Sequence, residues 1–283
     1  MPNRSAVNTS EREWLPFPRL FERGVFVRAC SNLGDLRATT ASRSTGSELD
    51  SVRTREHLAG RICAAAALND AGSADTCVGV ASDRRPIWPR GFVGSISHSR
   101  SVACAAVAKN TERLSVGIDS EPIFGSTSMK DAAPQILLDE EWRLVPPWEA
   151  ATLATVVFSA KESLFKCLYP LILVFFEFQD ACVESIVPAS DVDGVLSIRL
   201  RQILGPEIGP DRAFIGRYAF QDGHVHTGIE LGAEGGRDHQ KPRDGERPER
   251  GVPRGQPGGV LAPQCTAVVG ARGAHHRGAA RVE

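Results

Sequence analysis

Two acidic clusters contain the residues of this chain whose types and spacing could do chemistry. The first is residues 117–121 (GIDSE), and the second, about forty residues further on, is residues 158–166 (FSAKESLFK). Together they offer three carboxylates and two lysines in otherwise apolar surroundings: Asp119, Glu121, Glu162, Lys161 and Lys166. Mg²⁺ prefers hard oxygen ligands and usually takes only one or two carboxylates from protein, with water and substrate phosphate completing its shell. The clusters therefore suggest a site that holds Mg²⁺ against a phosphate ester.

The first cluster has the spacing of a strand. Asp119 and Glu121 are two residues apart, so on a strand their side chains share one face. Two neighbouring carboxylates repel each other unless a cation lies between them. A strand end with two solvated acids is the competing interpretation of this cluster taken alone.

The second cluster has the spacing of a helix. Glu162 and Lys166 are four residues apart, so on a helix they lie on one face. Such pairs are most often surface ion pairs worth tenths of a kcal/mol. Combined with the first cluster, however, a third carboxylate could complete a metal site and Lys166 could offset phosphate charge.

Two further groups could bind an anion. Residues 94–99 (GSISHS) place Ser95 and Ser97 beside His98, in a turn that exposes backbone N–H groups. Arg53 and Arg61 are eight residues apart, which puts them about 80° apart around a helix and lets them address one anion. A polar turn with an incidental histidine, and solvated helix arginines, remain the alternatives.

The elements that must position these residues form an α+β pattern. Helical periodicity predicts helices over residues 49–68 and 149–168, the second ended by Tyr169 and Pro170. Residues 122–134 read as a linker. We expect strands at residues 76–81, 92–97, 102–108, 114–119, 175–187, 195–200, 213–221 and 224–231.

Composition excludes several classes. The 283 residues carry a formal net charge of −1, so no field strong enough to attract nucleic acid or a membrane surface is expected. No apolar run is long enough to span a bilayer, and the start of the chain has no signal-peptide pattern. Seven cysteines without a C-x-x-C pair favour a reduced, cytoplasmic chain. Residues 234–283, which lack Phe, Trp, Tyr, Ile and Met, are predicted to be a disordered tail.

The ordered series of motifs resembles the 4'-phosphopantetheinyl transferases, in particular the enterobactin-synthetase type. The matching segments are residues 53–61 (RTREHLAGR), 88–98 (WPRGFVGSISH), 117–121 and 158–166, and the resemblance covers roughly residues 10–233. It implies two similar α+β halves, related by a pseudo-twofold, with the active site between them. The implied division is an N-terminal half over residues 1–122, a C-terminal half over 123–233 and the tail over 234–283.

The resemblance also implies roles for the candidate residues. CoA would be the donor, and a serine of an apo acyl or peptidyl carrier protein the acceptor. Asp119 and Glu162 would bind Mg²⁺, with Glu121 a ligand or a nearby base, and Lys166 would contact the CoA phosphates. The residues that would hold or line the 3'-phosphoadenosine end are Arg53, Arg61, His98, Ser95 and Ser97.

The chemistry of phosphoryl-type transfer is consistent with these residues. The serine hydroxyl must attack the β-phosphate of CoA and expel adenosine 3',5'-bisphosphate, which needs positioning and charge neutralisation. Mg²⁺ and Lys166 would supply neutralisation, and Glu162 or Glu121 could take the serine proton, so these three side chains are the catalytic candidates.

Two other functions share part of this residue pattern. A Mg²⁺-dependent nuclease would need a lysine where Pro122 follows Glu121. A non-catalytic homologue that binds a carrier protein or nucleotide is the main alternative, although the three carboxylates and Lys166 argue against it. The carrier protein cannot be named from sequence, but the motifs favour siderophore or secondary-metabolite assembly. Because the internal repeat would build one site within one chain, we expect a monomer.

Overall fold

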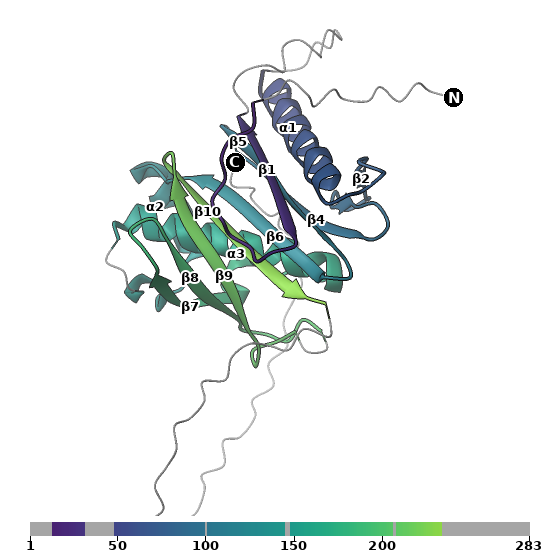
Figure 1. Cartoon of the computed structure of the whole chain (residues 1–283). Helices are drawn as coiled ribbons and strands as arrows, with labels where there is room; N and C mark the ends of the chain where they lie inside the picture. Colours follow the sequence, from purple (N-terminus) through teal and green to yellow (C-terminus); the bar gives the residue numbers. More distant parts are fainter. Residues whose placement is uncertain (1–12, 32–47, 100, 145–147, 206–207, 234–283) are drawn as a thin grey trace, which may run out of the picture. The chain divides into compact units, whose positions relative to one another are not determined.

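A computed structural model describes residues 13–31, 48–99, 101–144, 148–205 and 208–233, with side chains of the first helix described from Thr54 onward. All of these residues belong to one unit of the chain, Met1–Gly236. The tail predicted for 234–283 lies outside the described residues. The halves predicted over 1–122 and 123–233 remain a prediction. Figure 1 shows the arrangement of helices and strands.

The elements are helices and antiparallel strands, with two long runs of consecutive strands. In chain order they are β1 (Val25–Ser31), α1 (Glu48–Asp70), β2 (Gly79–Val80), β3 (Pro86–Ile87), β4 (Phe92–His98), β5 (Val102–Lys109), β6 (Arg113–Pro122), α2 (Ser126–Ile136), η2 (Glu141–Arg143), α3 (Ala150–Ile172), η3 (Phe178–Asp180), β7 (Ala181–Pro188), β8 (Asp193–Leu200), β9 (Ala213–Gln221) and β10 (His224–Gly232). The predicted α+β class is confirmed. None of these helices is long and apolar enough to cross a membrane.

The N-terminal part is a three-stranded antiparallel sheet covered by α1. The strand order is β1-β5-β4, and α1 lies across it (Figure 1). The interface is built from small side chains such as Ala59, Cys63 and Ala105, all fully buried. Small residues let the helix approach the sheet closely, which brings its polar face near the end of β4.

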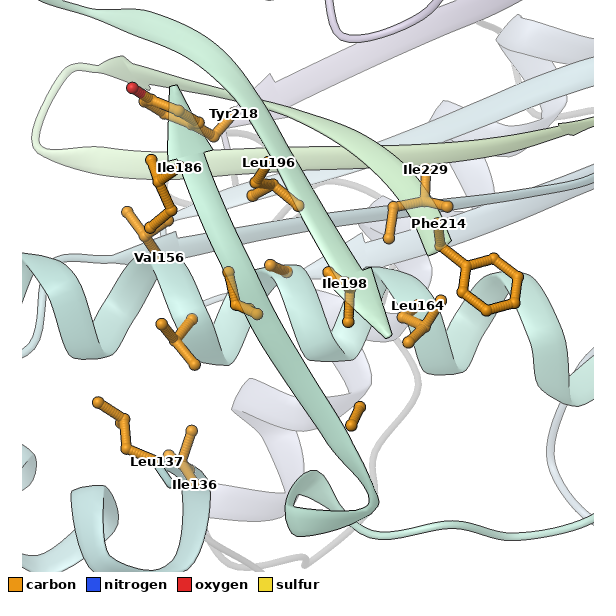
Figure 2. Close-up of a cluster of buried hydrophobic side chains, with 14 of the residues drawn as sticks. Ile136, Leu137, Val156, Leu164, Ile186, Leu196, Ile198, Phe214, Tyr218 and Ile229 are labelled. Atoms are coloured by element: carbon orange, nitrogen blue, oxygen red, sulfur yellow. The ribbon is translucent and has the colours of Figure 1, made fainter. Parts of the chain in front are cut away.

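The C-terminal part is a five-stranded antiparallel sheet with the order β6-β10-β9-β8-β7, and α3 lies against one face of it. Figure 2 shows side chains of α3, such as Val156 and Leu164, directed toward Leu196 and Ile198 of β8. This apolar contact fixes α3 over the sheet and therefore fixes the position of the second acidic cluster.

Gly117 sets the distance between α3 and β6. A Cβ at this position would collide with the Ser163 carbonyl oxygen and would lie 2.8 Å from the Cys167 backbone nitrogen. These are backbone atoms of α3, which cannot rotate away as a side chain can. The absence of a side chain at Gly117 thus allows α3 to cross β6 two residues before Asp119.

Strand β6 also joins the two sheets, through serine side chains rather than a strand ladder. The Ser95 hydroxyl accepts a hydrogen bond from Ile118 N at 3.1 Å, and the Ser97 hydroxyl accepts one from Ser120 N at 3.3 Å. These hydroxyls take the place of backbone pairing between β4 and β6, and we call this line of contact the seam. Lys166 of α3 reaches it and lies next to Ser97 and Asp119.

Four of the predicted elements differ from the structure. The strand predicted at 76–81 forms only at Gly79–Val80. The stretch predicted as a linker contains helix α2. Helix α3 continues through Pro170 to Ile172, where Leu173 takes a left-handed conformation (φ 53°) and its N–H bonds to Tyr169 O. The strand predicted at 175–187 begins only at Ala181, after η3. Strand β1 was not predicted.

Candidate active site

Asp119 is a fully buried carboxylate at the seam between β4 and β6. Its Oδ1 accepts hydrogen bonds from Lys166 Nζ at 2.6 Å and from the Ser97 hydroxyl at 2.9 Å. Its Oδ2 is buried and has no hydrogen-bond partner among the described residues. A buried carboxylate oxygen without a partner is costly, so this atom is positioned to bind a ligand that the protein itself does not supply.

Lys166 lies between Asp119 and Glu162. Its Nζ is 2.6 Å from Asp119 Oδ1 and 3.7 Å from Glu162 Oε2, and it is also 3.4 Å from the Ser97 hydroxyl. Desolvation acts against the ammonium, but the charges of Asp119 and Glu162 outweigh it, so the pKa of Lys166 is raised. Lys166 therefore stays charged, and its side chain keeps about a quarter of its surface, 25 %, exposed to solvent.

The other two carboxyl groups, those of Glu121 and Glu162, have raised pKa values. Burial and repulsion from Asp119 raise the pKa of Glu121 to about 9. Burial raises the pKa of Glu162, and repulsion from Asp119 adds to this against the opposing effect of Lys166. One lysine does not balance three neighbouring carboxylates, so full ionisation of the cluster is unfavourable until a cation is bound beside it.

The donor set is consistent with Mg²⁺. Among the described residues, no three His, Cys, Asp or Glu side chains form a complete metal-ligand group. Mg²⁺ does not require one, since it commonly keeps several waters and takes one or two carboxylates. The unpartnered Oδ2 of Asp119 and the carboxylate of Glu162, whose side chain is 27 % exposed, suit such a partial shell.

A basic patch, made of His57, Arg61, Arg84 and His98, lies beside Lys166. Desolvation and the charges of Lys166 and His57 lower the pKa of His98. Desolvation and the charges of Arg61 and Arg84 lower the pKa of His57. These mutual effects place the four side chains, from α1, β4 and the loop before β3, within electrostatic range of one another.

Three of the residues predicted to hold or line the anion site have other partners. Arg61 Nη1 donates to Val78 O at 2.7 Å and to Gly79 O at 2.9 Å, so it also holds the chain entering β2. The Ser95 hydroxyl is buried and bonded to β6, as is that of Ser97. The side chain of Arg53 lies outside the described residues.

Lys161, one of the two lysines of the second acidic cluster, has its ammonium bonded outside the site. It is 1 % exposed, and its Nζ donates to Glu141 Oε2 and to Ile136 O, both at 2.8 Å. Glu141 also accepts hydrogen bonds from Leu138 N and Val183 N, each at 2.7 Å. The pair ties α3 to the segments around it.

The structure thus brings Asp119, Glu162, Lys166 and Ser97 together and places Glu121 and His98 within electrostatic reach. Sequence reasoning missed His57 and Arg84. His57 lies four residues before Arg61 on α1, a spacing that places both on one helix face and could have identified it. Nothing in the local sequence identifies Arg84, because its loop reaches the patch only through the fold.

Comparison with known families agrees with this arrangement. Residues 49–108 match the family described as "4'-phosphopantetheinyl transferase N-terminal domain". Residues 115–203 match the family described as "4'-phosphopantetheinyl transferase superfamily". The first match contains α1 and β4, and the second contains β6 and α3.

Individual relatives cover much of the same region. The chain is 30 % identical to 4'-phosphopantetheinyl transferase Npt of Nocardia iowensis over 202 residues, which is 69 % of this chain and 90 % of Npt. It is 34 % identical to 4'-phosphopantetheinyl transferase Svp of Streptomyces mobaraensis over 194 residues, 65 % of this chain and 74 % of Svp. Enterobactin synthase component D of Escherichia coli K12 is 42 % identical over 117 residues, 40 % of this chain and 54 % of that protein.

Proposed function

We propose that this chain, which belongs to the 4'-phosphopantetheinyl transferase superfamily, transfers the 4'-phosphopantetheine arm of CoA to a serine of an apo carrier protein. The observation that carries the proposal is the buried Asp119 carboxylate. One of its oxygens is held by Lys166 and Ser97, while the other has no hydrogen-bond partner among the described residues and lies in a cluster of three carboxylates.

Asp119 and Glu162 are the residues that would hold Mg²⁺, with Glu121 beside them as a third ligand or a base. A bound Mg²⁺ would neutralise charge on the pyrophosphate of CoA. Lys166, which stays protonated, would bind a phosphate oxygen and share the same task. Because transfer of a phosphoryl group depends mainly on positioning and charge stabilisation, these side chains need supply little covalent chemistry.

The basic patch would hold the 3'-phosphate end of CoA. Binding energy from this remote group can orient the reacting phosphate against the incoming hydroxyl. The carrier serine would then attack the β-phosphate and expel adenosine 3',5'-bisphosphate. Either Glu121 or Glu162 would take the serine proton through a water molecule.

The biological setting is proposed by analogy with relatives. Enterobactin synthase component D shares 42 % identity over the matched region, which supports a role in siderophore or related secondary-metabolite assembly. We further propose a monomer that works in the cytoplasm, because one chain supplies both halves of the site and the acceptor is a carrier protein.

Intact-mass measurement of carrier proteins tests the proposal. The purified chain is incubated with CoA, Mg²⁺ and apo forms of acyl, aryl and peptidyl carriers. We expect one carrier class to gain the mass of one phosphopantetheine arm, and EDTA to abolish the gain.

The matched variants are Glu162→Gln, which should abolish transfer, and Glu184→Gln. Glu184 is an exposed partner of Arg199 on β7, so its replacement should leave transfer unchanged. A folded wild-type chain that binds CoA but modifies no carrier would instead support the non-catalytic alternative.

A further inference from the structure

The hairpin between β9 and β10 has a rigid, sequence-encoded turn. Its two central residues, Asp222 and Gly223, both have positive φ values, 48° and 73°, and His224 pairs with Gln221 across them. Positive φ at both positions of a two-residue loop is the type I′ geometry that Asp-Gly favours. The turn therefore presents His224 in a fixed place at the start of β10.

The hydrogen bonds of His224 determine its tautomer. Nδ1 lies 3.0 Å from the carbonyl oxygen of Asp222, which can only accept, so Nδ1 carries the proton. In the neutral ring Nε2 is then an acceptor, and the Ser101 hydroxyl, 2.7 Å away, donates to it. His224 is only 9 % exposed, so this bond is largely shielded from water.

This bond joins parts of the chain that are 123 residues apart. Ser101 belongs to the turn between β4 and β5, three residues after His98. The same hairpin turn also accepts a hydrogen bond at Gly223 O from Ile123 N, at 3.1 Å. Ile123 follows directly on β6, the strand that carries Asp119 and Glu121. The hairpin turn is thus bonded to both segments that bring the basic patch and the acidic cluster together.

We propose that Ser101 and His224 are positioning residues, a latch that holds the β4–β5 turn, and with it His98, in register with the acidic cluster on β6. The inference rests on the proposed function, since the ligand that needs this register is CoA, bound by its 3'-phosphate end at one side and its pyrophosphate at the other. The latch acts through His98 and makes no contact with the reacting atoms.

A double-mutant cycle on CoA binding tests the latch. The variants are Ser101→Ala, His224→Leu and the double variant in the full chain, with CoA dissociation constants from calorimetry and kcat from the carrier assay. Loss of one buried hydrogen bond should weaken CoA binding about fivefold to tenfold in each single variant. Because both substitutions remove the same hydrogen bond, the double variant should bind CoA about as well as the single variant with the lower affinity. In all three variants kcat should change less than about twofold.

Two controls separate positioning from general stability. Ser101→Thr keeps a hydroxyl and should bind CoA like the wild type. Ser190→Ala removes a comparable turn bond, from the Ser190 hydroxyl to Asp193 Oδ1 at 2.6 Å, between β7 and β8, and should leave CoA binding unchanged. Hydrogen exchange without CoA should accelerate in peptides covering the β4–β5 turn of His224→Leu and stay unchanged in β8.

The results distinguish this inference from the proposed function. Any one of three results would overturn the latch: unchanged CoA affinity in both single variants, additive losses of affinity in the double variant, or unchanged hydrogen exchange of the β4–β5 turn. If the wild type nevertheless binds CoA and modifies carriers, the proposed function still stands. A wild type that binds no CoA would overturn the proposed function and the latch with it.

Discussion

Replacing Gly117 by alanine should impair both stability and transfer, because the added Cβ meets the backbone of α3. The Cβ would collide with the Ser163 carbonyl oxygen and lie 2.8 Å from Cys167 N and 2.9 Å from Cys167 Cβ. Restoring ordinary contacts requires α3 to move by roughly 1 Å, and overpacking of this kind costs about 1–3 kcal/mol.

The same displacement carries Lys166 and Glu162 away from Asp119. The Lys166–Asp119 bond of 2.6 Å would be stretched beyond hydrogen-bond length. A misplacement of about 1 Å in a site of this kind can cost about 100-fold in rate. We therefore expect the kcat of Gly117→Ala to fall by about two orders of magnitude in the carrier-protein assay, with a thermal midpoint lowered by roughly 2–12 °C.

Gly216→Ala is the matched control. Its Cβ would meet Leu196 Cδ1 at 2.9 Å and Ile229 Cγ1 at 3.0 Å, which are side-chain atoms in the sheet core away from the acidic cluster. This variant should lose stability while its kcat stays within about threefold of wild type. A Gly117→Ala protein with wild-type kcat and thermal midpoint would refute the argument that close packing of α3 on β6 sets the site.

Three further predictions concern buried polar groups. Lys161→Ala leaves the carboxylate of Glu141 buried without its cation and should cost about 3–5 kcal/mol of unfolding free energy in urea titration; a cost below 1 kcal/mol would contradict the ion-pair role. Ser97→Ala removes a hydrogen bond to Asp119 and should lower kcat/KM for CoA by about 10–100-fold; unchanged kinetics would exclude that role. Burial lowers the pKa of His226 from 6.5 to about 4, so the unfolded chain binds the extra proton first as pH falls. The contribution of neutral His226 to the unfolding free energy should therefore be fully present above pH 6.5 and fall by about 3 kcal/mol toward pH 4. Denaturant titrations at each pH should show a smaller loss in His226→Phe.

Most strands and both long helices follow from periodicity, but α2 and the end of α3 do not. The start of α2 is rich in Ser and Thr, and Pro134 lies inside it, which together read as a linker. The helix forms because Ala132, Ala133 and Ile136 bury one face against α3 and its neighbours. At the end of α3, Ile172 packs on the same core and stabilises a turn beyond Pro170 that local propensity does not favour. Tertiary packing overrode the local signal in both places.

Part of the candidate site could also be predicted from the sequence, and part could not. The spacing of Asp119, Glu162 and Lys166 identified groups that the structure brings into contact. The partners of Lys161, Ser95 and Arg61 could not be predicted, because each is bonded to a segment that lies far from it in the sequence or on another element. Sequence spacing reports which residues share a face, whereas the seam between β4 and β6 exists only once both sheets have formed.

An anomalous difference map from crystals of the chain grown with CoA and Mn²⁺ in place of Mg²⁺ tests the central claim most directly. We expect one strong manganese peak bound to Asp119 Oδ2 and Glu162, with the CoA pyrophosphate beside it and Lys166. A map with CoA bound but no peak at these carboxylates, or with manganese bound elsewhere, would contradict the assignment of this cluster as the metal and phosphate site.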